Sequence, residues 1–172
     1  MTTNELFPLV DAAGNVVGSV ERRVAHANRT LLHPVVHCLV LNRRGHVLMQ
    51  KRSTTKDIQP GKWDTSVGGH LCYGEDVLAA LRREAAEEIG LRVDDHGVRF
   101  LYRYIQRSEV ESELVSTFFC CAEGPFVPQA SEIDAVRFWT PEEISEHLGS
   151  GLFTPNFEDE WARYRRYCED GA

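Results

Sequence analysis

The chain has 172 residues, of which 42% are hydrophobic and 26% charged, and its formal net charge is −7. This composition suits one soluble globular domain and argues against wholesale disorder. An acidic chain is a poor candidate for a general nucleic-acid binder, although a small anionic substrate needs only a local basic cluster.

The N-terminal residues carry no recognisable targeting signal. Residues 1–5 lack a basic region and an apolar run, and no stretch of the chain approaches the roughly 18 apolar residues of a membrane-spanning helix. The five cysteines are odd in number and show no CxxC spacing, so we expect reduced thiols and a cytoplasmic protein. We expect no nucleic-acid or membrane partner, and a homodimer is left open.

Turn-forming residues divide the first part of the chain into short apolar segments. Strands over 9–10 and 16–17 flank a run of Asp, Gly and Asn, which predicts a hairpin. Strands over 35–41 and 47–50 flank a second polar turn and predict a second hairpin. Residues 53–64 are rich in Ser, Thr, Pro and Gly and are predicted to form a loop.

The rest of the chain alternates between helical and strand patterns. The predicted elements are a strand over 65–70, a helix over 76–89 ending at Gly90, strands over 99–105, 114–122 and 136–139, a helix that begins near 140, and a terminal helix over 156–168. Mixed strands with few helices predict an α/β or α+β sandwich.

The helix over 76–89 brings three carboxylates together at the edge of its apolar face. At about 100° per residue, Glu84, Glu87 and Glu88 share one arc. The neighbouring apolar arc consists of Val77, Leu78, Leu81, Ala85 and Ile89. Three anions within one turn repel one another, and a hard divalent cation such as Mg²⁺ or Mn²⁺ would relieve that repulsion. The alternative is a solvated face of Glu and Arg.

The run from Gly69 to Leu91 resembles the Nudix box, G-x5-E-x7-R-E-U-x-E-E-x-G-U, in which U is aliphatic. The matching residues are Gly69, Glu75, Arg83, Glu84, Ala85, Glu87, Glu88, Gly90 and Leu91. The resemblance implies a Nudix fold, with a mixed β-sheet sandwiched between helices, over a single domain of residues 1–172. Residues 1–34 would then form an N-terminal β-hairpin extension.

The family typically hydrolyses a diphosphate linked to another moiety, using Mg²⁺ or Mn²⁺. By this resemblance Glu84, Glu87 and Glu88 would hold metal on the diphosphate, and Arg83 would orient a box carboxylate by pairing with Glu75. Metal ions neutralise diphosphate oxygens and lower the pKa of a bound water, which attacks one phosphorus.

The sequence on both sides of the box is similar to a particular Nudix branch, the type I isopentenyl diphosphate isomerases and their hydrolase-like relatives. Those isomerases bind a second metal through histidines and glutamates outside the helix. The counterparts in this chain are His26, His33, His70, Glu111 and Glu113, and Glu113 also matches a catalytic glutamate. Three histidines and two carboxylates suit Mn²⁺, Fe²⁺ or Zn²⁺. The alternative is that they are surface or core-edge residues in a solvated turn.

One position departs from the isomerase pattern. The isomerases carry a catalytic cysteine directly before the Gly-His pair, where this chain has Gly68. Cys72 follows four residues later, across the glycine turn. The isomerases also tend to have a degenerate box, whereas this one is complete, and both facts favour hydrolysis.

A basic cluster precedes the box and is predicted to face a diphosphate. It consists of Lys51, Arg52, Lys56 and Lys62. The preferred hypothesis is a metal-dependent hydrolase acting on a nucleoside diphosphate derivative or similar small molecule. The alternatives are an isopentenyl diphosphate isomerase and a non-catalytic nucleotide-binding sensor.

Overall fold

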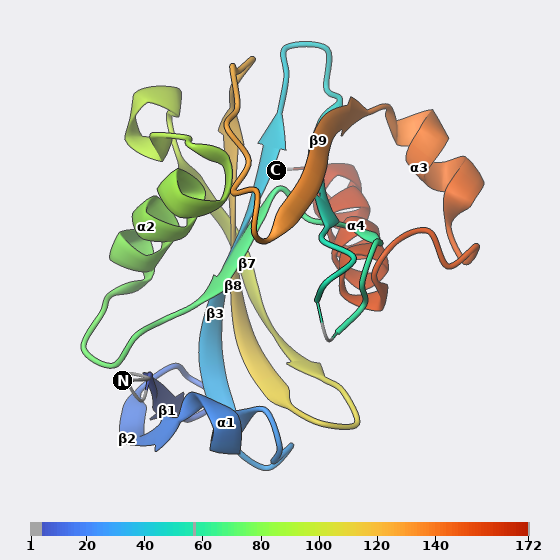
Figure 1. Cartoon of the computed structure of the whole chain (residues 1–172). Helices are drawn as coiled ribbons and strands as arrows, with labels where there is room; N and C mark the ends of the chain where they lie inside the picture. Colours follow the sequence, from blue (N-terminus) through green and yellow to red (C-terminus); the bar gives the residue numbers. More distant parts are fainter. Residues whose placement is uncertain (1–4, 57, 172) are drawn as a thin grey trace.

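The computed structural model describes residues 5–56 and 58–171, and it places a mixed β-sheet between helices (Figure 1). The strand order is β5-β4-β3-β8-β7, with β6 also paired to β3 and β9 paired to β4. The strands of this sheet are β3 (Leu32–Leu41), β4 (Val47–Arg52), β5 (Trp63–Asp64), β6 (Val67–His70), β7 (Arg99–Arg107), β8 (Ser112–Cys121) and β9 (Ile133–Trp139). The predicted α/β sandwich is therefore confirmed.

The helices cover both faces of the sheet. Figure 1 shows α2 on one side and α3 and α4 on the other. The helices are α1 (Arg22–Ala25), α2 (Val77–Ile89), α3 (Pro141–His147) and α4 (Pro155–Glu169), with a short 3₁₀ turn η1 (Val93–His96). The short α1 and η1 were not predicted. No helix within 5–56 and 58–171 is long and apolar enough to cross a membrane.

Strand β3 lies at the centre of the core because both of its faces are covered. Successive side chains of a strand point to opposite faces. Val36 and Val40 pack in the cluster beneath α2, whereas Leu39 and Leu41 pack in the cluster beneath α3 and α4. A strand buried on both faces has a nearly continuous apolar sequence, as residues 35–41 have apart from His37.

The predicted second hairpin is wrong in its extent. Strands β3 and β4 meet only where Leu41 pairs with Val47. From Leu32 to Leu41, β3 instead pairs in parallel with β8, and its middle section pairs with β6. A local pattern of turn residues does not reveal a partner about 80 residues away. The predicted loop over 53–64 also contains β5 at its end.

Helix α2 begins and ends where its sequence predicts. The Asp76 side chain accepts a hydrogen bond from the Ala79 N–H, and Gly90 adopts the left-handed conformation at the C-terminus, with φ of 67°. Leu78 is a correction, because it is 42% exposed. It lies in the first turn at the rim of the apolar arc, and the helix's buried residues begin only at Ala80.

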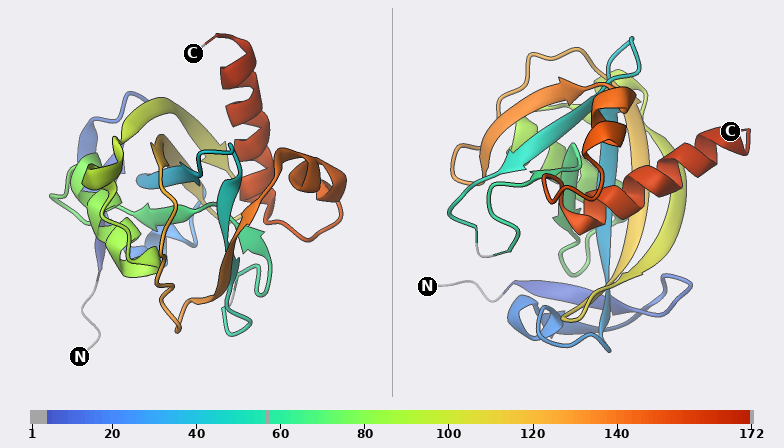
Figure 2. Two further views of the ribbon diagram at one scale, coloured as in Figure 1. Left: turned by 90° about the horizontal axis from the view of Figure 1, so that it is seen from above. Right: turned by 90° about the vertical axis from the view of Figure 1, so that its right-hand side faces the viewer.

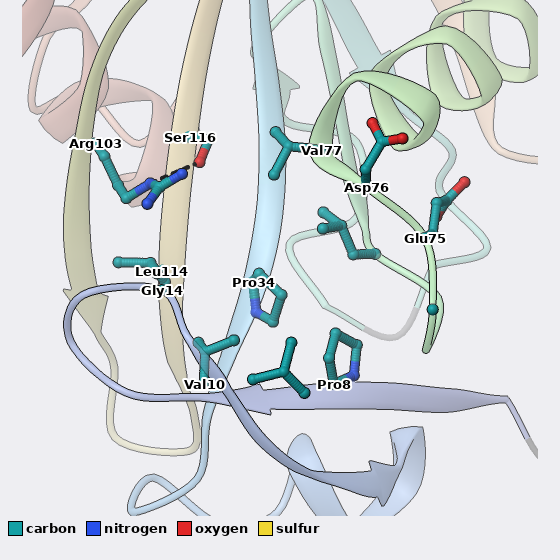
Figure 3. A pocket seen from close by; sticks show the side chains of 13 residues that line it. Pro8, Val10, Gly14, Pro34, Glu75, Asp76, Val77, Arg103, Leu114 and Ser116 are labelled. Carbon is teal, nitrogen blue, oxygen red and sulfur yellow. Dashed lines mark hydrogen bonds between the residues drawn. The ribbon is translucent and has the colours of Figure 1, made fainter.

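The predicted N-terminal hairpin is present as β1 (Leu6–Val10) and β2 (Val16–Glu21). In Figures 1 and 2 it lies across one end of the sheet. A cavity of about 360 Å³ separates the hairpin from the start of α2 and is lined largely by apolar side chains such as Val10, Pro34 and Val77 (Figure 3). The box residue Glu75 lines this smaller cavity, whereas the predicted metal-binding and substrate-binding residues do not.

Candidate active site

A larger cavity of about 770 Å³ brings together side chains from several elements. Its walls include residues of α2, β4 and β6, the beginning of α4, and the segment that joins β7 to β8. We call it the main cavity. Glu84 and Glu88 of the box line it, as do His26 and His70 of the predicted histidine group.

Glu88 is the most strongly perturbed of the box carboxylates. Its Oε2 accepts hydrogen bonds from the Gly68 backbone N–H, at 3.0 Å, and from Gln50 Nε2, at 3.1 Å. Burial raises the pKa of Glu88 to about 8, because these two neutral donors only partly replace water. The carboxylate therefore lies in a position where a bound cation would stabilise its charged form.

Glu84 lines the main cavity and is held by Arg83. Arg83 Nη1 donates to Glu84 Oε1 at 2.7 Å, while Nε and Nη2 donate to the two oxygens of Glu75 at 3.0 and 2.9 Å. The guanidinium thus makes the pairing with Glu75 that the box resemblance implies. Burial raises the pKa of Glu84 and Arg83 opposes the rise. A side chain at Gly69 would overlap with the Glu84 carboxyl group, so this position needs glycine for space.

Glu87 lies apart from the other two carboxylates. Its side chain is 55% exposed and its Oε2 is 3.5 Å from Arg83 Nη1. It does not line the main cavity. The three glutamates that share an arc in the sequence are thus divided into a partly buried pair, Glu84 and Glu88, and an exposed neighbour.

The predicted histidine group assembles from distant segments. The ligand atoms of His26, His33, His70 and Glu111 all lie within 4.8 Å of one another. His26 Nε2 is 3.1 Å from His70 Nε2 and 3.7 Å from Glu111 Oε2. His26 follows α1, His33 lies on β3 and His70 ends β6, so the chain fold brings the group together.

Two buried atoms of this group lack a hydrogen-bond partner in the part of the chain that is described, His33 Nε2 and Glu111 Oε2. A buried polar atom without a hydrogen-bond partner or a bound ion lowers the stability of the fold. Burial lowers the pKa of His26 to about 4 and also lowers that of His33, while burial raises the pKa of Glu111. Neutral imidazoles and a carboxylate converging on one point suit a transition-metal ion.

Glu113 is adjacent to the group, although it is not one of the four residues whose ligand atoms converge. It is 8% exposed, pairs with His33 across the β3–β8 ladder, and its Oε1 is 3.6 Å from His70 Nε2. The fifth predicted ligand therefore lies beside His70.

The structure divides the predicted basic cluster. Arg52 and Lys56 line the main cavity, whereas Lys51 and Lys62 do not. Side chains alternate along β4, so Lys51 points away from the face that carries Gln50 and Arg52. Each lining cation already has an acid partner, Asp64 for Arg52 at 3.3 Å and Glu132 for Lys56.

Sequence reasoning missed a buried ion pair in the cavity wall. His37 lines the main cavity, and its Nδ1 is 3.0 Å from Oε2 of Glu160, which is fully buried. The signal was present in the terminal helix, because Glu160 lies three residues after Phe157 and next to Trp161, on the apolar stripe. An acidic residue in such a stripe indicates a buried partner.

Cys72, the nearest thiol to the missing isomerase cysteine, does not line the main cavity. Its backbone N–H donates to Glu75 at 3.0 Å, within the loop that leads into α2, and burial raises the pKa of its thiol. At Gly68, a Cβ would lie 3.2 Å from His37 Cδ2. The His37 ring therefore takes up the space beside the position where the isomerases carry their cysteine.

Comparisons with known proteins agree with the resemblance drawn from the box and the sequence around it. An uncharacterized Nudix hydrolase of Yersinia pestis, YPO2781/y1614, is similar at 36% identity over 154 residues, 88% of this chain and 81% of that protein. Isopentenyl-diphosphate Delta-isomerase 1 of Photorhabdus laumondii is 29% identical over 161 residues, 90% of this chain and 91% of that protein.

The crystal structure of DR0079 from Deinococcus radiodurans has the same fold, with a TM-score of 0.81 at 23% identity over 92% of this chain and 98% of that chain. Residues 31–157 match the NUDIX domain family itself. Because this match covers most of the chain, the protein belongs to the NUDIX domain family.

Proposed function

We propose that this Nudix protein is a metal-dependent hydrolase that cleaves the diphosphate linkage of a nucleoside diphosphate derivative or a similar small molecule. One observation carries the proposal: two enclosed carboxylates, Glu84 and Glu88, share the main cavity with Arg52 and Lys56. Anionic side chains bind cations and cationic side chains bind phosphate oxygens, so one cavity offers both partners that the reaction needs.

The residues fit a divalent cation. Glu88 has a raised pKa and, among residues 5–56 and 58–171, only neutral hydrogen-bond donors, so that part of the chain supplies no positive partner for it. Glu84 and Glu88 would hold the cation, and Glu87 would contribute from the exposed side. When bound, such a cation neutralises diphosphate oxygens and makes a water nucleophilic near neutral pH.

The chain's own side chains supply orientation and charge. Arg83 keeps one Glu84 oxygen fixed while Glu75 holds the guanidinium from the other side. Arg52 and Lys56 would bind the outer phosphate oxygens. Glu113, near the histidines, is the candidate for accepting a proton in the cavity.

The decisive experiment is a substrate panel assayed with Mg²⁺ and with Mn²⁺. The panel contains nucleoside diphosphates and triphosphates, dinucleotides, sugar nucleotides, coenzyme A and isoprenoid diphosphates. We expect metal-dependent release of a phosphate or a nucleotide from at least one member. Binding of a nucleotide without turnover of any compound would instead support the sensor hypothesis.

A second metal site is proposed at His26, His33, His70 and Glu111, with Glu113 beside them. Protein reconstituted with Mn²⁺, Fe²⁺ or Zn²⁺ should retain one such ion after removal of free metal, and a His26→Ala/His33→Ala double variant should lose it. A His46→Ala/His96→Ala variant is the matched control, because neither residue lines the main cavity. Elemental analysis that finds no retained metal in the reconstituted parent would contradict this site.

The alternative function is an isopentenyl diphosphate isomerase. The histidine group is compatible with it, and an isomerase relative is similar over 90% of this chain. Allylic isomerisation needs two acid/base groups on opposite faces of the hydrocarbon. Gly68 offers no side chain, and Cys72 lies outside the main cavity. We expect no isomerisation of isopentenyl diphosphate, and diphosphate cleavage unaffected by thiol alkylation. Formation of dimethylallyl diphosphate, abolished in Cys72→Ala, would favour the isomerase.

A further inference from the structure

His37 uses its two ring nitrogens differently. Nδ1 lies 3.0 Å from Glu160 Oε2, inside the protein. Nε2 has no hydrogen-bond partner among residues 5–56 and 58–171. His37 is 9% exposed and lines the main cavity, so its remaining exposure is on the cavity side.

Glu160 fixes the orientation and the charge of this ring. Its Oε1 accepts a hydrogen bond from Thr117 Oγ1 at 2.8 Å and its Oε2 faces His37 Nδ1, so each carboxylate oxygen has a partner. Burial opposes a charged imidazole, but the ion pair and hydrogen bond with Glu160 outweigh it and raise the pKa of His37 to about 9. With Nδ1 committed to Glu160, a protonated ring presents an Nε2–H donor to the cavity.

The same ring lies beside the carboxylate end of the cavity. His37 pairs with Gly68 across the β3–β6 ladder, and the Gly68 N–H donates to Glu88. A Cβ at position 68 would be 3.5 Å from His37 Nε2, which places that nitrogen over the strand residue that holds Glu88. A side chain at position 68 would crowd the His37 ring, and glycine avoids that contact.

We propose that His37 is a substrate-binding residue whose Nε2–H donates to a non-bridging oxygen of the diphosphate, with Glu160 as the positioning residue behind it. This inference rests on the proposed hydrolase function and names a further contact in that site. It gives the cavity a cation whose ring is held by its contact with Glu160, unlike Arg52 and Lys56, whose side chains are long and flexible. Charge-assisted donors of this kind bind phosphate oxygens strongly.

A purely structural ion pair would need Nδ1 alone, and this difference can be tested with two substitutions. In asparagine the amide nitrogen is attached to Cγ, as Nδ1 is in histidine, so H37N keeps a donor toward Glu160 and loses the donor toward the cavity. In glutamine the amide nitrogen lies one bond further out, so H37Q keeps a donor toward the cavity and loses the partner of Glu160.

The experiment measures binding of methylenediphosphonate, a diphosphate analogue that cannot be hydrolysed, in the presence of Mg²⁺. We expect H37N to weaken binding by about 10- to 100-fold, the range of a charge-assisted hydrogen bond, with a parallel rise in KM and a smaller change in kcat. H37Q should bind within about 5-fold of the parent and show the lower Tm. H37N binding with the parent's affinity, or a parent that does not bind the analogue, would overturn the inference.

Controls separate this inference from the proposed function. H96N changes a histidine outside the main cavity and should bind the analogue like the parent. Glu84→Gln tests the hydrolase itself, because its carboxylate is removed from the metal end. Retained turnover in Glu84→Gln would count against the proposed function, whereas an inactive Glu84→Gln beside an H37N variant with parental KM would refute only the role of His37.

Discussion

Glu88 and Glu160 both lie inside the protein, yet their hydrogen-bond partners differ in charge. Glu88 receives two neutral hydrogen bonds on one oxygen, and its pKa rises to about 8. Glu160 has a donor on each oxygen, one of them the imidazole of His37, whose pKa rises to about 9. Within the described part of the chain, Glu88 has no positive partner, whereas Glu160 has His37.

The difference helps to distinguish a functional site from a structural support. A buried carboxylate that the chain itself neutralises can be explained by folding alone. A buried carboxylate without a positive partner lowers stability and calls for an external cation. The same contrast separates the histidines. His26 and His33 have lowered pKa values, and His33 Nε2 lacks a hydrogen-bond partner among the described residues, whereas Nδ1 of His37 is paired with Glu160.

The largest effect should come from neutralising the carboxylates that lack a positive partner. Glu88→Gln and Glu84→Gln are each expected to reduce turnover by at least about 10²-fold, since each removes charge that would hold metal at the reacting phosphate. Glu87→Gln should have a smaller effect because its side chain is largely exposed. Steady-state kinetics with circular dichroism as a folding check would measure this, and full activity in either of the first two variants would contradict the box assignment.

The same substitution should have opposite effects on stability at the two positions. In metal-free protein, the pKa of about 8 means that Glu88 must take up a proton on folding at pH 7, so Glu88→Gln removes that cost and should raise the free energy of unfolding by about 1–2 kcal/mol. Glu160→Gln breaks a compensated pair and should lower it by about 1–3 kcal/mol. Urea denaturation in EDTA at pH 7 measures both. Equal destabilisation of the two variants would contradict the proposed difference between the two carboxylates.

The pH dependence of stability would sharpen the comparison at the paired end. The pKa of His37 is about 9 in the folded protein and about 6.5 when unfolded, so the pair contributes fully below about pH 6.5 and is lost as pH rises through about 9. Glu113 and Asp64 add negative potential that favours the charged ring. The difference in Tm between the parent and Glu160→Gln should therefore be largest near pH 6 and shrink toward pH 10. A difference that widens with pH would refute the assignment of charge.

The smallest effects are expected among the surface cations. Lys56→Ala should raise KM by about 3- to 10-fold, because the ammonium lines the main cavity and would bind a phosphate oxygen. Lys51→Ala should change KM by less than about 2-fold, as expected for a surface side chain outside the cavity. KM values of the two variants measured at one ionic strength would test this. Equal increases in KM would instead support the four-residue basic cluster predicted from the sequence.

The sequence predicts best where one local segment determines the outcome. Helix α2 is predicted well because its cap, its periodicity and its C-terminal Gly90 are all local signals. The parallel β3–β8 pairing is missed because its partners are far apart in the chain. Local apolar runs show that a strand is buried, but they do not show which strand lies beside it.

The candidate site shows the same division. The histidine group was expected from the spacing of His26 and His33 and from the isomerase resemblance, and the structure brings its ligand atoms together. His37 was missed because it resembles one more residue of an apolar strand. Its role depends on Glu160, which is 123 residues away and whose contacts only the three-dimensional arrangement reveals.

Phe7 in the N-terminal hairpin bears on which residues a shortened version of the protein must contain. Its buried ring stacks on His70, with centroids 4.5 Å apart, and also contacts the rings of His26 and His33. Phe7, His26 and Glu160 all lie outside residues 31–157, the span that matches the family. A protein shortened to residues 31–157 would thus keep the box but lose His26, the Phe7 ring that packs against it, and Glu160, the partner of His37. Any chimera or shortened version that preserves this chemistry has to carry both flanks.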